Sequence, residues 1–244
     1  MKFKDMEKTD IHCHLLNGVD DGAAGLEEAL DLLKMEEEDG VSRIIITPHL
    51  RHGMFETPDE EIVRRFKQLI EEKNARKIDV KLSLSREYHY DKCIAKAITE
   101  GTIIPMSGDV LLTEFSHMTP YETIVNAVLK LRKRELTPLI AHIERYECIQ
   151  KDPEKVSSLK EAGALTQVNA GSILGEEGRK EKKTAHALIK ENLIFAVASD
   201  AHDTEFRKPN LKKCEAYLTK KFGDTYAEQV LNKNPRKLFE VLKG

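Results

Sequence analysis

Thr9-Asp10-Ile11-His12-Cys13-His14 is a short run near the start of the chain that ends in two histidines separated by one residue. Side chains alternate between the two faces of a β-strand, so His12 and His14 leave the same face and can bind one metal ion. Cys13 points to the other face, where we expect a buried thiol rather than a ligand. Two ligands at the end of an early strand predict a metal site at the edge of a parallel sheet.

The same pattern, a short apolar run followed by a helical stretch, recurs along the chain. Runs of strand length lie at 9–14, 43–47, 79–86, 110–115, 138–142, 164–169 and 193–198. Stretches with helical spacing of apolar residues lie between them, at 24–39, 58–76, 91–99, 120–135, 153–162 and 178–191. This alternation predicts a parallel sheet covered by helices.

After Asp200 the pattern changes to two helical stretches, 209–221 and 223–242, the second interrupted near Asn234-Pro235. We expect these helices to close or flank the fold. No linker, repeat or low-complexity tract divides the chain. Because 244 residues are an ordinary length for one α/β barrel, we expect a single domain over residues 1–244.

Composition and charge disfavour several classes of partner. The 39 basic and 42 acidic residues give a formal net charge of −3, and no basic face is evident, which disfavours nucleic acid. No stretch approaches the roughly 20 apolar residues of a membrane span. Residues 1–5 lack the apolar core of a signal peptide, so we expect a cytoplasmic protein. The sequence does not indicate an oligomeric state.

Further candidate ligands stand at or just beyond the predicted strands: His49, Glu87, Glu114, His142, Asp200 and His202. A carboxylate that follows a buried strand is costly to bury without a cation, and a metal site supplies one. The carboxyl ends of parallel strands meet at one end of a barrel, so these side chains are expected to form one cluster.

The Gly/Asp turn at residues 17–22 supplies two more carboxylates beside the first histidine pair. One of Asp20 and Asp21 can ligate a metal while the other caps the helix that starts near Ala24. The remaining histidines do not follow strands and are expected at the surface or behind the ligands: His52, His89, His117 and His186.

Seven short motifs together resemble a known superfamily. In chain order they are D-I-H-C-H, V-D-D-G, T-P-H, R-E-Y, T-E-F, A-H-I-E-R and S-D-A-H, within residues 9–207. They resemble the PHP superfamily, named for polymerase and histidinol phosphatase domains. More closely, the chain is similar to the capsule-associated bacterial tyrosine-protein phosphatases of the CpsB/CapC type.

The resemblance implies a distorted (β/α)7 barrel that binds three divalent metal ions. The residues it assigns are His12, His14, Glu87 and Asp200 for the first ion, Glu87, Glu114 and His142 for the second, and Asp21, His49 and His202 for the third. It also places Arg145 and Arg207 to grip phosphate, which suits guanidinium geometry. Mn is the metal that the resemblance favours, although mixed His and carboxylate ligands also accept Fe or Zn.

The implied activity is metal-dependent hydrolysis of phosphotyrosine by activated water. The implied substrate is a tyrosine-phosphorylated protein, namely the tail of a bacterial tyrosine kinase that controls polysaccharide export. A histidinol-phosphate or other small-molecule phosphatase on the same metal core remains an alternative, as does a non-catalytic PHP scaffold. A metal-activated nuclease is disfavoured by the acidic charge balance.

The cysteine pattern argues against a thiol-based tyrosine phosphatase. Such enzymes require an arginine six positions after the catalytic cysteine. The positions six residues beyond Cys13, Cys93, Cys148 and Cys214 hold Val19, Thr99, Glu154 and Lys220. No C-x-x-C pair occurs, so reduced thiols without a phosphocysteine intermediate are expected.

Three motifs depart from the pattern of many relatives. Leu50 replaces the second histidine of T-P-H-H, Ile143 replaces the proline of A-H-P-E-R, and Ser85-Arg86-Glu87 replaces G-Q-E. None of these changes removes a predicted ligand. We expect Arg86 to face outward rather than into the pocket.

Overall fold

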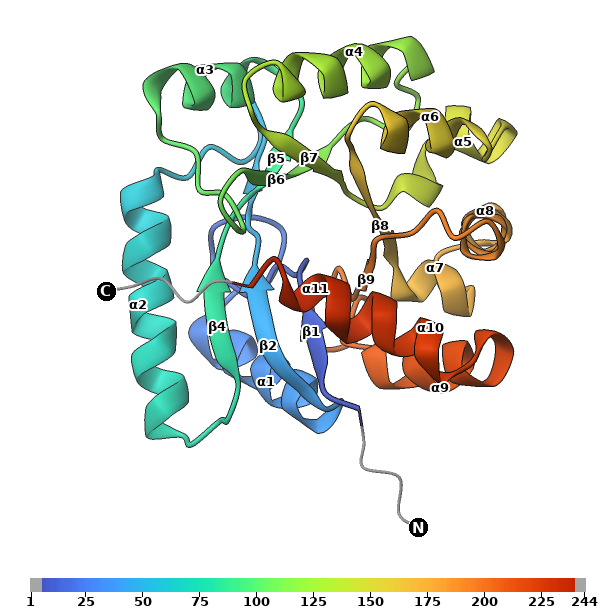
Figure 1. Cartoon of the computed structure of the whole chain (residues 1–244). Helices are drawn as coiled ribbons and strands as arrows, with labels where there is room; N and C mark the ends of the chain where they lie inside the picture. The colour runs from blue at the N-terminus through green and yellow to red at the C-terminus, as the bar shows by residue number, and fades with distance from the viewer. Residues whose placement is uncertain (1–5, 240–244) are drawn as a thin grey trace.

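Residues 6–239, which the computed structural model describes, contain seven strand positions that curl into a ring (Figure 1). The strands are β1 (Lys8–Asp10), β2 (Val41–Ile46), β3 (His49–Leu50), β4 (Lys81–Leu84), β5 (Glu87–His89), β6 (Val110–Glu114), β7 (Thr137–Ile140), β8 (Leu165–Asn169) and β9 (Ala196–Ala198). Every ladder between them is parallel. The alternation of strands and helices expected from the sequence is therefore confirmed.

Two of the strand positions are interrupted, which distorts the ring. β2 and β3 are separated by Thr47-Pro48, and the predicted strand 79–86 divides into β4 and β5. The ladders run in the orders β1-β2-β4 and β3-β5-β6-β7-β8-β9. Main-chain bonds bridge the interruption, since the Ser85 amide donates to the Ile46 carbonyl at 2.9 Å.

The first and last strand positions meet and close the ring. Beyond β1, the His14 amide donates to the Ala201 carbonyl at 2.8 Å, and the Asp200 amide donates to the His12 carbonyl at 2.9 Å. Cys13 and Ala201 form a parallel bridge. The expected distorted (β/α)7 barrel is confirmed.

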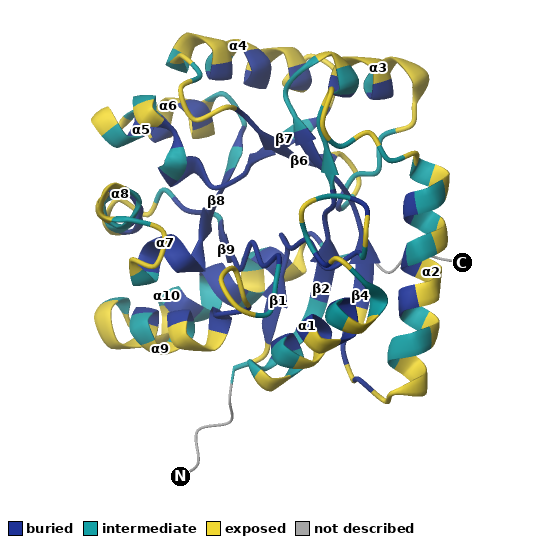
Figure 2. Ribbon diagram, turned by 180° about the vertical axis from the view of Figure 1, so that it is seen from behind, coloured by how far each residue is buried: buried dark blue, intermediate teal, exposed yellow. Residues whose placement is uncertain are grey.

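Helices cover the outside of the ring, with buried faces toward the strands and exposed faces toward solvent (Figure 2). The α-helices are α1 (Leu26–Glu38), α2 (Asp59–Ala75), α3 (Lys92–Glu100), α4 (Tyr121–Arg132), α5 (Glu147–Lys151), α6 (Lys155–Glu161), α7 (Ala170–Leu174), α8 (Arg179–Lys190), α9 (Leu211–Phe222), α10 (Asp224–Glu228) and α11 (Asn234–Arg236). The short turns η1 (Ile143–Arg145), a 3-10 helix, and η2 (Gln229–Lys233), a π-helix, complete them. Among residues 6–239, no helix combines the length and the apolarity needed to cross a membrane.

Of the predicted helix 223–242, residues 224–236 are helical in the consecutive elements α10, η2 and α11. Residues 237–238 form a turn rather than helix, residue 239 is not helical, and residues 240–242 lie outside the described range. Pro235 lies in the first turn of α11, directly after the π-helical turn. Proline lacks an amide hydrogen and crowds the preceding turn, so a local change of helix type at this point has a physical cause.

The interior of the barrel holds its own apolar cluster, separate from the larger layer between strands and helices. Its members include Ile11, Ile45, Leu112, Leu139, Ala196 and Ala198, with Met106, Val110 and Leu238. Leu238 packs in this cluster with Phe195 and Leu165, which lie at or before the starts of β9 and β8. The C-terminal segment thus seals the amino-terminal end of the barrel, as the sequence led us to expect.

We predict that Leu238→Ala lowers the free energy of unfolding by about 2–4 kcal/mol, because it leaves a cavity in the barrel interior. Leu129→Ala on α4 is the matched control, since Leu129 is 51% exposed. Its effect should stay within about 0.5 kcal/mol. Urea unfolding of both variants checks this, and equal losses would contradict the sealing role of Leu238.

Candidate metal centre

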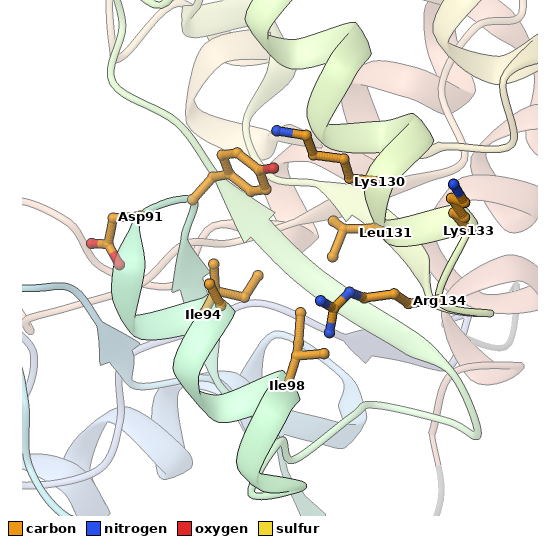
Figure 3. A pocket seen from close by; sticks show the side chains of 9 residues that line it. Asp91, Ile94, Ile98, Lys130, Leu131, Lys133 and Arg134 are labelled. Atoms are coloured by element: carbon orange, nitrogen blue, oxygen red, sulfur yellow. The ribbon is translucent and has the colours of Figure 1, made fainter.

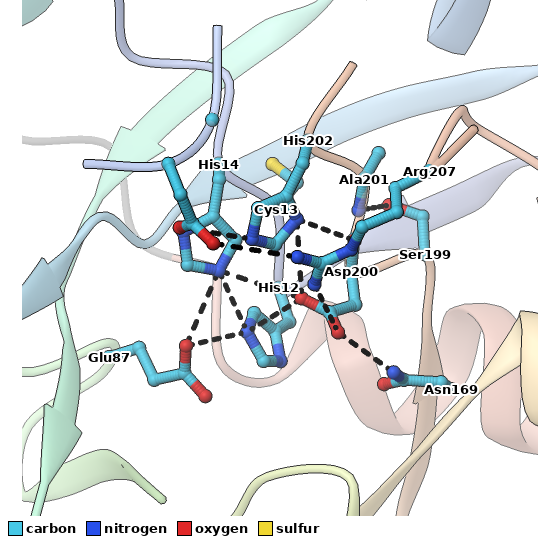
Figure 4. Close-up of polar contacts among 12 residues, drawn as sticks. His12, Cys13, His14, Glu87, Asn169, Ser199, Asp200, Ala201, His202 and Arg207 are labelled. Carbon is cyan, nitrogen blue, oxygen red and sulfur yellow. Dashed lines mark hydrogen bonds and ion pairs between the residues drawn. The ribbon is translucent and has the colours of Figure 1, made fainter. Parts of the chain in front are cut away.

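Histidines and carboxylates gather at the carboxyl ends of the strands, opposite the apolar seal. His12 Nε2 lies 3.2 Å from His14 Nε2. Glu87 Oε2 lies 3.2 Å from the first of these nitrogens and 3.3 Å from the second (Figure 4). Asp200 Oδ1 lies 3.4 Å from His12 Nε2 and 3.6 Å from His14 Nε2. These four side chains, which the family resemblance assigns to the first ion, face one another.

Glu87 occupies the middle of the cluster and reaches the next group of candidates. Its Oε1 lies 3.0 Å from His142 Nε2, and its Oε2 lies 3.0 Å from His49 Nδ1. Glu114 lies beside both histidines, at 3.9 Å from His142 Nε2 and 3.5 Å from His49 Nδ1. A carboxylate whose two oxygens face different histidines has the geometry that a bridging ligand requires.

The third group lies on the open side of the cluster. Asp21 Oδ1 is 3.5 Å from His49 Nε2 and 3.4 Å from His202 Nε2. The His202 ring stacks on His14 with centroids 3.9 Å apart. The Asp21 side chain is 47% exposed, whereas the Glu87 side chain is 1% exposed. The cluster therefore opens to solvent on the Asp21 side.

All nine candidate ligands thus converge, and several groups of them could hold a cation. Their ligand atoms lie within 4.8 Å of one another in the groups His12, His14 and Asp200; His12, Glu87 and His142; His49, Glu87 and Glu114; and His14, Asp21, His49 and His202. The family resemblance assigns His49 to the third ion alone, whereas in the structure His49 faces both Glu87 and Asp21 and belongs to two of these groups.

Buried polar atoms that lie near one another but form no hydrogen bond test whether this donor set suits metal ions. Glu87 Oε2, Glu114 Oε1, His49 Nδ1 and His202 Nε2 are buried and make no hydrogen bond within the described residues. Unpaired buried polar groups are rare and costly in folded proteins. Imidazole nitrogens and carboxylate oxygens are the ligands that divalent transition metals accept, so the residues present fit such ions.

The charges in the cluster shift the pKa values of its members. Burial opposes ionisation of Glu87, but the adjacent His12 and His49 hold its pKa well below the usual range. Burial and the negative charge of Glu87 raise the pKa of Glu114 to about 8. Burial lowers the pKa of His12, but the negative charges of Glu87 and Asp200 outweigh it and raise that pKa to about 9. His12 and Glu114 therefore have to lose protons before they can ligate a metal.

The backbone is strained at two of the candidate ligands. His142 and Asp200, which follow β7 and β9, have φ angles of 32° and 54°. This left-handed region is uncommon for residues other than glycine and costs about 1 kcal/mol or more. The Gln167 side chain accepts the His142 amide at 2.8 Å, and the His12 carbonyl accepts the Asp200 amide. These bonds hold both side chains over the mouth of the barrel.

Asp20 has a role that the sequence did not reveal. Its Oδ2 accepts from His14 Nδ1 at 2.7 Å and from the His49 amide at 2.9 Å, and its Oδ1 accepts from the Gly22 amide. The expectation that one Asp of this turn caps a helix is wrong, because Gly25 is the N-cap of α1 without a side-chain cap. Asp20 instead fixes the tautomer of His14 with Nε2 facing the cluster.

Gln167 and Asn169 at the end of β8 were also missed. Gln167 Oε1 lies 3.1 Å from His12 Nδ1, and Asn169 Nδ2 donates to Asp200 Oδ2 at 2.8 Å. The signal was present in the sequence, since two polar residues with strand spacing end the predicted strand 164–169. Neutral amides at this place orient ligands without adding charge.

Arg145 and Arg207 converge on the outer oxygen of Asp200. Their Nη1 and Nη2 atoms lie 3.3 Å and 3.1 Å from Asp200 Oδ2. Both guanidinium groups border a hollow of about 390 Å³, whose lining also includes Phe206 and Lys208. Two cations beside a metal-ligand cluster can bind an anionic group that also contacts the cluster.

Arg86 contradicts our expectation that it faces outward, because it is 1% exposed. It donates to the carbonyls of His49 at 2.7 Å and Thr57 at 3.0 Å, and it pairs with Asp59 at 2.6 Å. The start of α2 covers the guanidinium, whose two Nη atoms make these bonds, whereas its buried Nε has no hydrogen-bond partner among residues 6–239. Arg86 thereby holds the main chain of His49 from behind.

His52, His117 and Cys13 lie where the sequence places them. His52 is at the surface and pairs with Glu56 at 2.9 Å, and His117 is exposed. Although His52, Glu56 and Cys93 could also approach one ion, this group lies near the surface. Cys13 is buried, and its thiol lies 3.7 Å from the Ile45 carbonyl.

Comparisons with known proteins agree with this geometry. Residues 8–240 match the family described as "Capsular polysaccharide synthesis, CpsB/CapC". Tyrosine-protein phosphatase CpsB of Streptococcus pneumoniae is 34% identical over 236 residues, which cover 94% of this chain and 97% of that protein. Tyrosine-protein phosphatase YwqE of Bacillus subtilis is 29% identical, covering 88% of this chain and 85% of that protein.

Solved structures show the same likeness. A crystal structure from work on B. subtilis YwqE and S. pneumoniae CpsB, described as unique metal-dependent tyrosine phosphatases, superposes with a TM-score of 0.87 at 26% identity and covers 94% of this chain and 93% of that one. An organophosphorus hydrolase superposes with a TM-score of 0.63 at 11% identity, covering 96% of this chain and 92% of the hydrolase chain. The second likeness shows the fold alone.

We predict that Asp20→Asn weakens Mn²⁺ binding by about 10–100-fold. The amide has one acceptor where the carboxylate has two, so an NH₂ group must face either the Gly22 amide or the His14 and His49 donors. Isothermal titration with Mn²⁺ measures the affinity. Asp79→Asn, an exposed carboxylate away from the cluster, is the control, and unchanged affinity in Asp20→Asn would refute the positioning role.

Proposed function

The chain belongs to the CpsB/CapC family of capsular polysaccharide synthesis proteins, and on that basis we propose that it is a metal-dependent protein-tyrosine phosphatase. The observation that carries the proposal is the pair Arg145 and Arg207 beside the nine-residue cluster. The tyrosine-phosphatase names of relatives at 29–34% identity support it. The family match over residues 8–240 supports one phosphatase unit over this range.

We assign the cluster as the ligands of three divalent ions, with Mn favoured. His12, His14, Glu87 and Asp200 would hold one ion, Glu87, Glu114 and His142 a second, and Asp21, His49 and His202 a third. Bound divalent ions supply activated water at neutral pH and offset the negative charge of a phosphoryl group.

The residues of the chain itself bind and orient the phosphate. Arg145 and Arg207 each present donors toward Asp200 Oδ2, at the border between the cluster and the hollow. A phosphoryl oxygen that enters beside Asp200 can accept from both guanidinium groups. Such charge-assisted bonds stabilise the charge that develops on the phosphoryl group during transfer.

The leaving group of phosphotyrosine needs little protonation by the protein. Phenol has a pKa of about 10, far below that of an aliphatic alcohol, so it departs with little protonation. A strong general acid is therefore less critical for phosphotyrosine than for an alkyl phosphate.

A thiol route is disfavoured by the environment of the cysteines. Burial raises the pKa of Cys13 well above its usual range, and the thiol points away from the cluster toward Ile45. A neutral, buried thiol is a poor nucleophile.

The proposed substrate is a tyrosine-phosphorylated protein, specifically the tail of a bacterial tyrosine kinase that controls polysaccharide export. The tyrosine-phosphatase names of the relatives support the substrate class. The identification of a kinase tail as the substrate is based on the family resemblance alone. A small-molecule phosphatase and a scaffold are the alternatives, and the presence of all nine candidate ligands disfavours the scaffold.

We predict that a phosphotyrosine peptide releases phosphate in the presence of Mn²⁺ and that a chelator abolishes release. Iodoacetamide should have no effect, because the reaction uses no thiol. Histidinol phosphate, measured side by side, should react much more slowly. Comparable rates on both substrates would favour the small-molecule alternative, and no release from either with metal bound would refute catalysis.

We also predict that Arg145→Lys and Arg207→Lys each lower kcat/KM for a phosphotyrosine peptide by about 10²-fold. Lysine keeps the charge but loses the fork of donors that fits a phosphate. Arg179→Lys at the exposed start of α8 is the control. Bound metal, measured by elemental analysis, should be unchanged in all three, which separates loss of phosphate contact from loss of the metal centre.

A further inference from the structure

A hollow of about 370 Å³ lies outside the barrel, between α3 and α4 (Figure 3). Ile94 and Leu131 form its buried floor together with the half-buried Ile98. Ala95 on the exposed side of α3 contributes only a methyl group, which leaves the space open. The floor can therefore receive an apolar side chain from another molecule.

Three cations border this hollow: Lys130, Lys133 and Arg134, at the end of α4. None of them forms a salt bridge with another residue in the range 6–239. Arg132 in the same turn differs, because it lies 3.6 Å from Asp109. The lining also contains one carboxylate, Asp91, which caps α3 by accepting from the Cys93 amide. The three free cations outnumber it and give this groove a net positive rim, although the chain as a whole carries a net charge of −3.

The groove begins next to the candidate metal centre. The Tyr90 amide donates to the carbonyl of the candidate ligand Glu114 at 2.9 Å, and the Tyr90 ring lies 5.4 Å from Phe115. From there α3 runs away from the mouth of the barrel. A helix of nine residues is about 13 Å long, which an extended chain covers in about four residues.

We propose that the α3–α4 groove binds an acidic segment with an apolar side chain, in the same polypeptide that presents its phosphotyrosine to the metal centre. The proposal rests on the proposed phosphatase function. The apolar side chain enters the hollow over Ile94, Ile98 and Leu131, and the carboxylates contact the free cations. Affinity for a substrate then depends on residues outside the phosphotyrosine, and this contribution weakens with salt.

A membrane surface fits these observations less well. The apolar floor is recessed between two helices, whereas insertion into a bilayer requires apolar side chains that project from the surface. A segment of polypeptide can reach the recessed floor. Binding to anionic vesicles is accordingly an outcome that the experiment has to exclude.

The test compares three peptides with the same phosphotyrosine core: a short one, one extended by an acidic segment that contains leucine, and one extended by a basic segment. The variant is Lys133→Glu with Arg134→Glu. Lys220→Glu with Lys221→Glu in the last turn of α9 is the matched control, because it makes the same charge change at a helix end. Phosphate release is measured with Mn²⁺ at two salt concentrations.

For the wild-type protein we expect a KM about ten-fold lower for the acidic extended peptide than for the short one. In the groove variant, KM for the acidic extended peptide should rise to that of the short peptide, with kcat unchanged. KM for the short peptide should be the same in the groove variant and the wild-type protein. The matched control variant should behave like the wild-type protein on both peptides. High salt should reduce the advantage in the wild-type protein. The basic extension should not lower KM for the wild-type protein or for the groove variant.

Three results would refute the proposed binding site in the groove. The first is an equal KM for the acidic and the short peptide with the wild-type protein. The others are a rise in KM for the acidic peptide that is equally large in the matched control, or a rise in the groove variant that is equally large for the short peptide. Groove-dependent binding to phosphatidylserine vesicles without any peptide effect would assign the surface to membranes instead. If no peptide is hydrolysed even by the wild-type protein, the proposed function fails. Fluorescence anisotropy with an unphosphorylated acidic peptide then still tests the groove by itself.

Discussion

The buried carboxylate of Glu87 is the constraint around which the site is built. Its two oxygens lie 3.0–3.3 Å from nitrogens of His12, His14, His49 and His142. Its position follows from the interruption after β4, which lets β5 pair with β3 and β6 so that Glu87 stands beside His49 and Leu112 in register. A carboxylate at this depth has to be matched by positive charge, and the surrounding imidazoles are the ligands that bring a metal ion to it.

The two ends of the barrel have different roles: one stabilises the fold, and the other holds the candidate metal ligands. At the amino ends of the strands, Leu238 and Met106 close the interior with apolar contacts. At the carboxyl ends, amides and carboxylates such as Asp20, Gln167 and Asn169 hold the candidate ligands in place. The strained backbone at His142 and Asp200 is located on the same side. Strain and buried charge are tolerated there because the rest of the barrel is sealed and well packed.

The proposed phosphate contacts and the proposed groove flank the mouth from different sides. Arg145 and Arg207 follow β7 and β9, whereas the groove begins beside β5 and β6. A bound polypeptide would cross the metal centre between them. Chemistry and recognition can then be varied separately, because the residues that would ligate metal do not line the groove.

The sequence by itself determined the strand-end positions of the candidate ligands. A parallel α/β barrel brings the carboxyl ends of its strands together, so residues as distant as His12 and Asp200 could be grouped by their place in the pattern. Local patterns did not predict contacts between elements far apart in sequence. Three features depend on how helices and loops pack. They are the hydrogen bond between Asp20 and His14, the burial of Arg86 under α2, and the position of the free cations at the end of α4 beside α3. Only the tertiary structure decided these features, because burial and partners are properties of the assembled chain rather than of any segment.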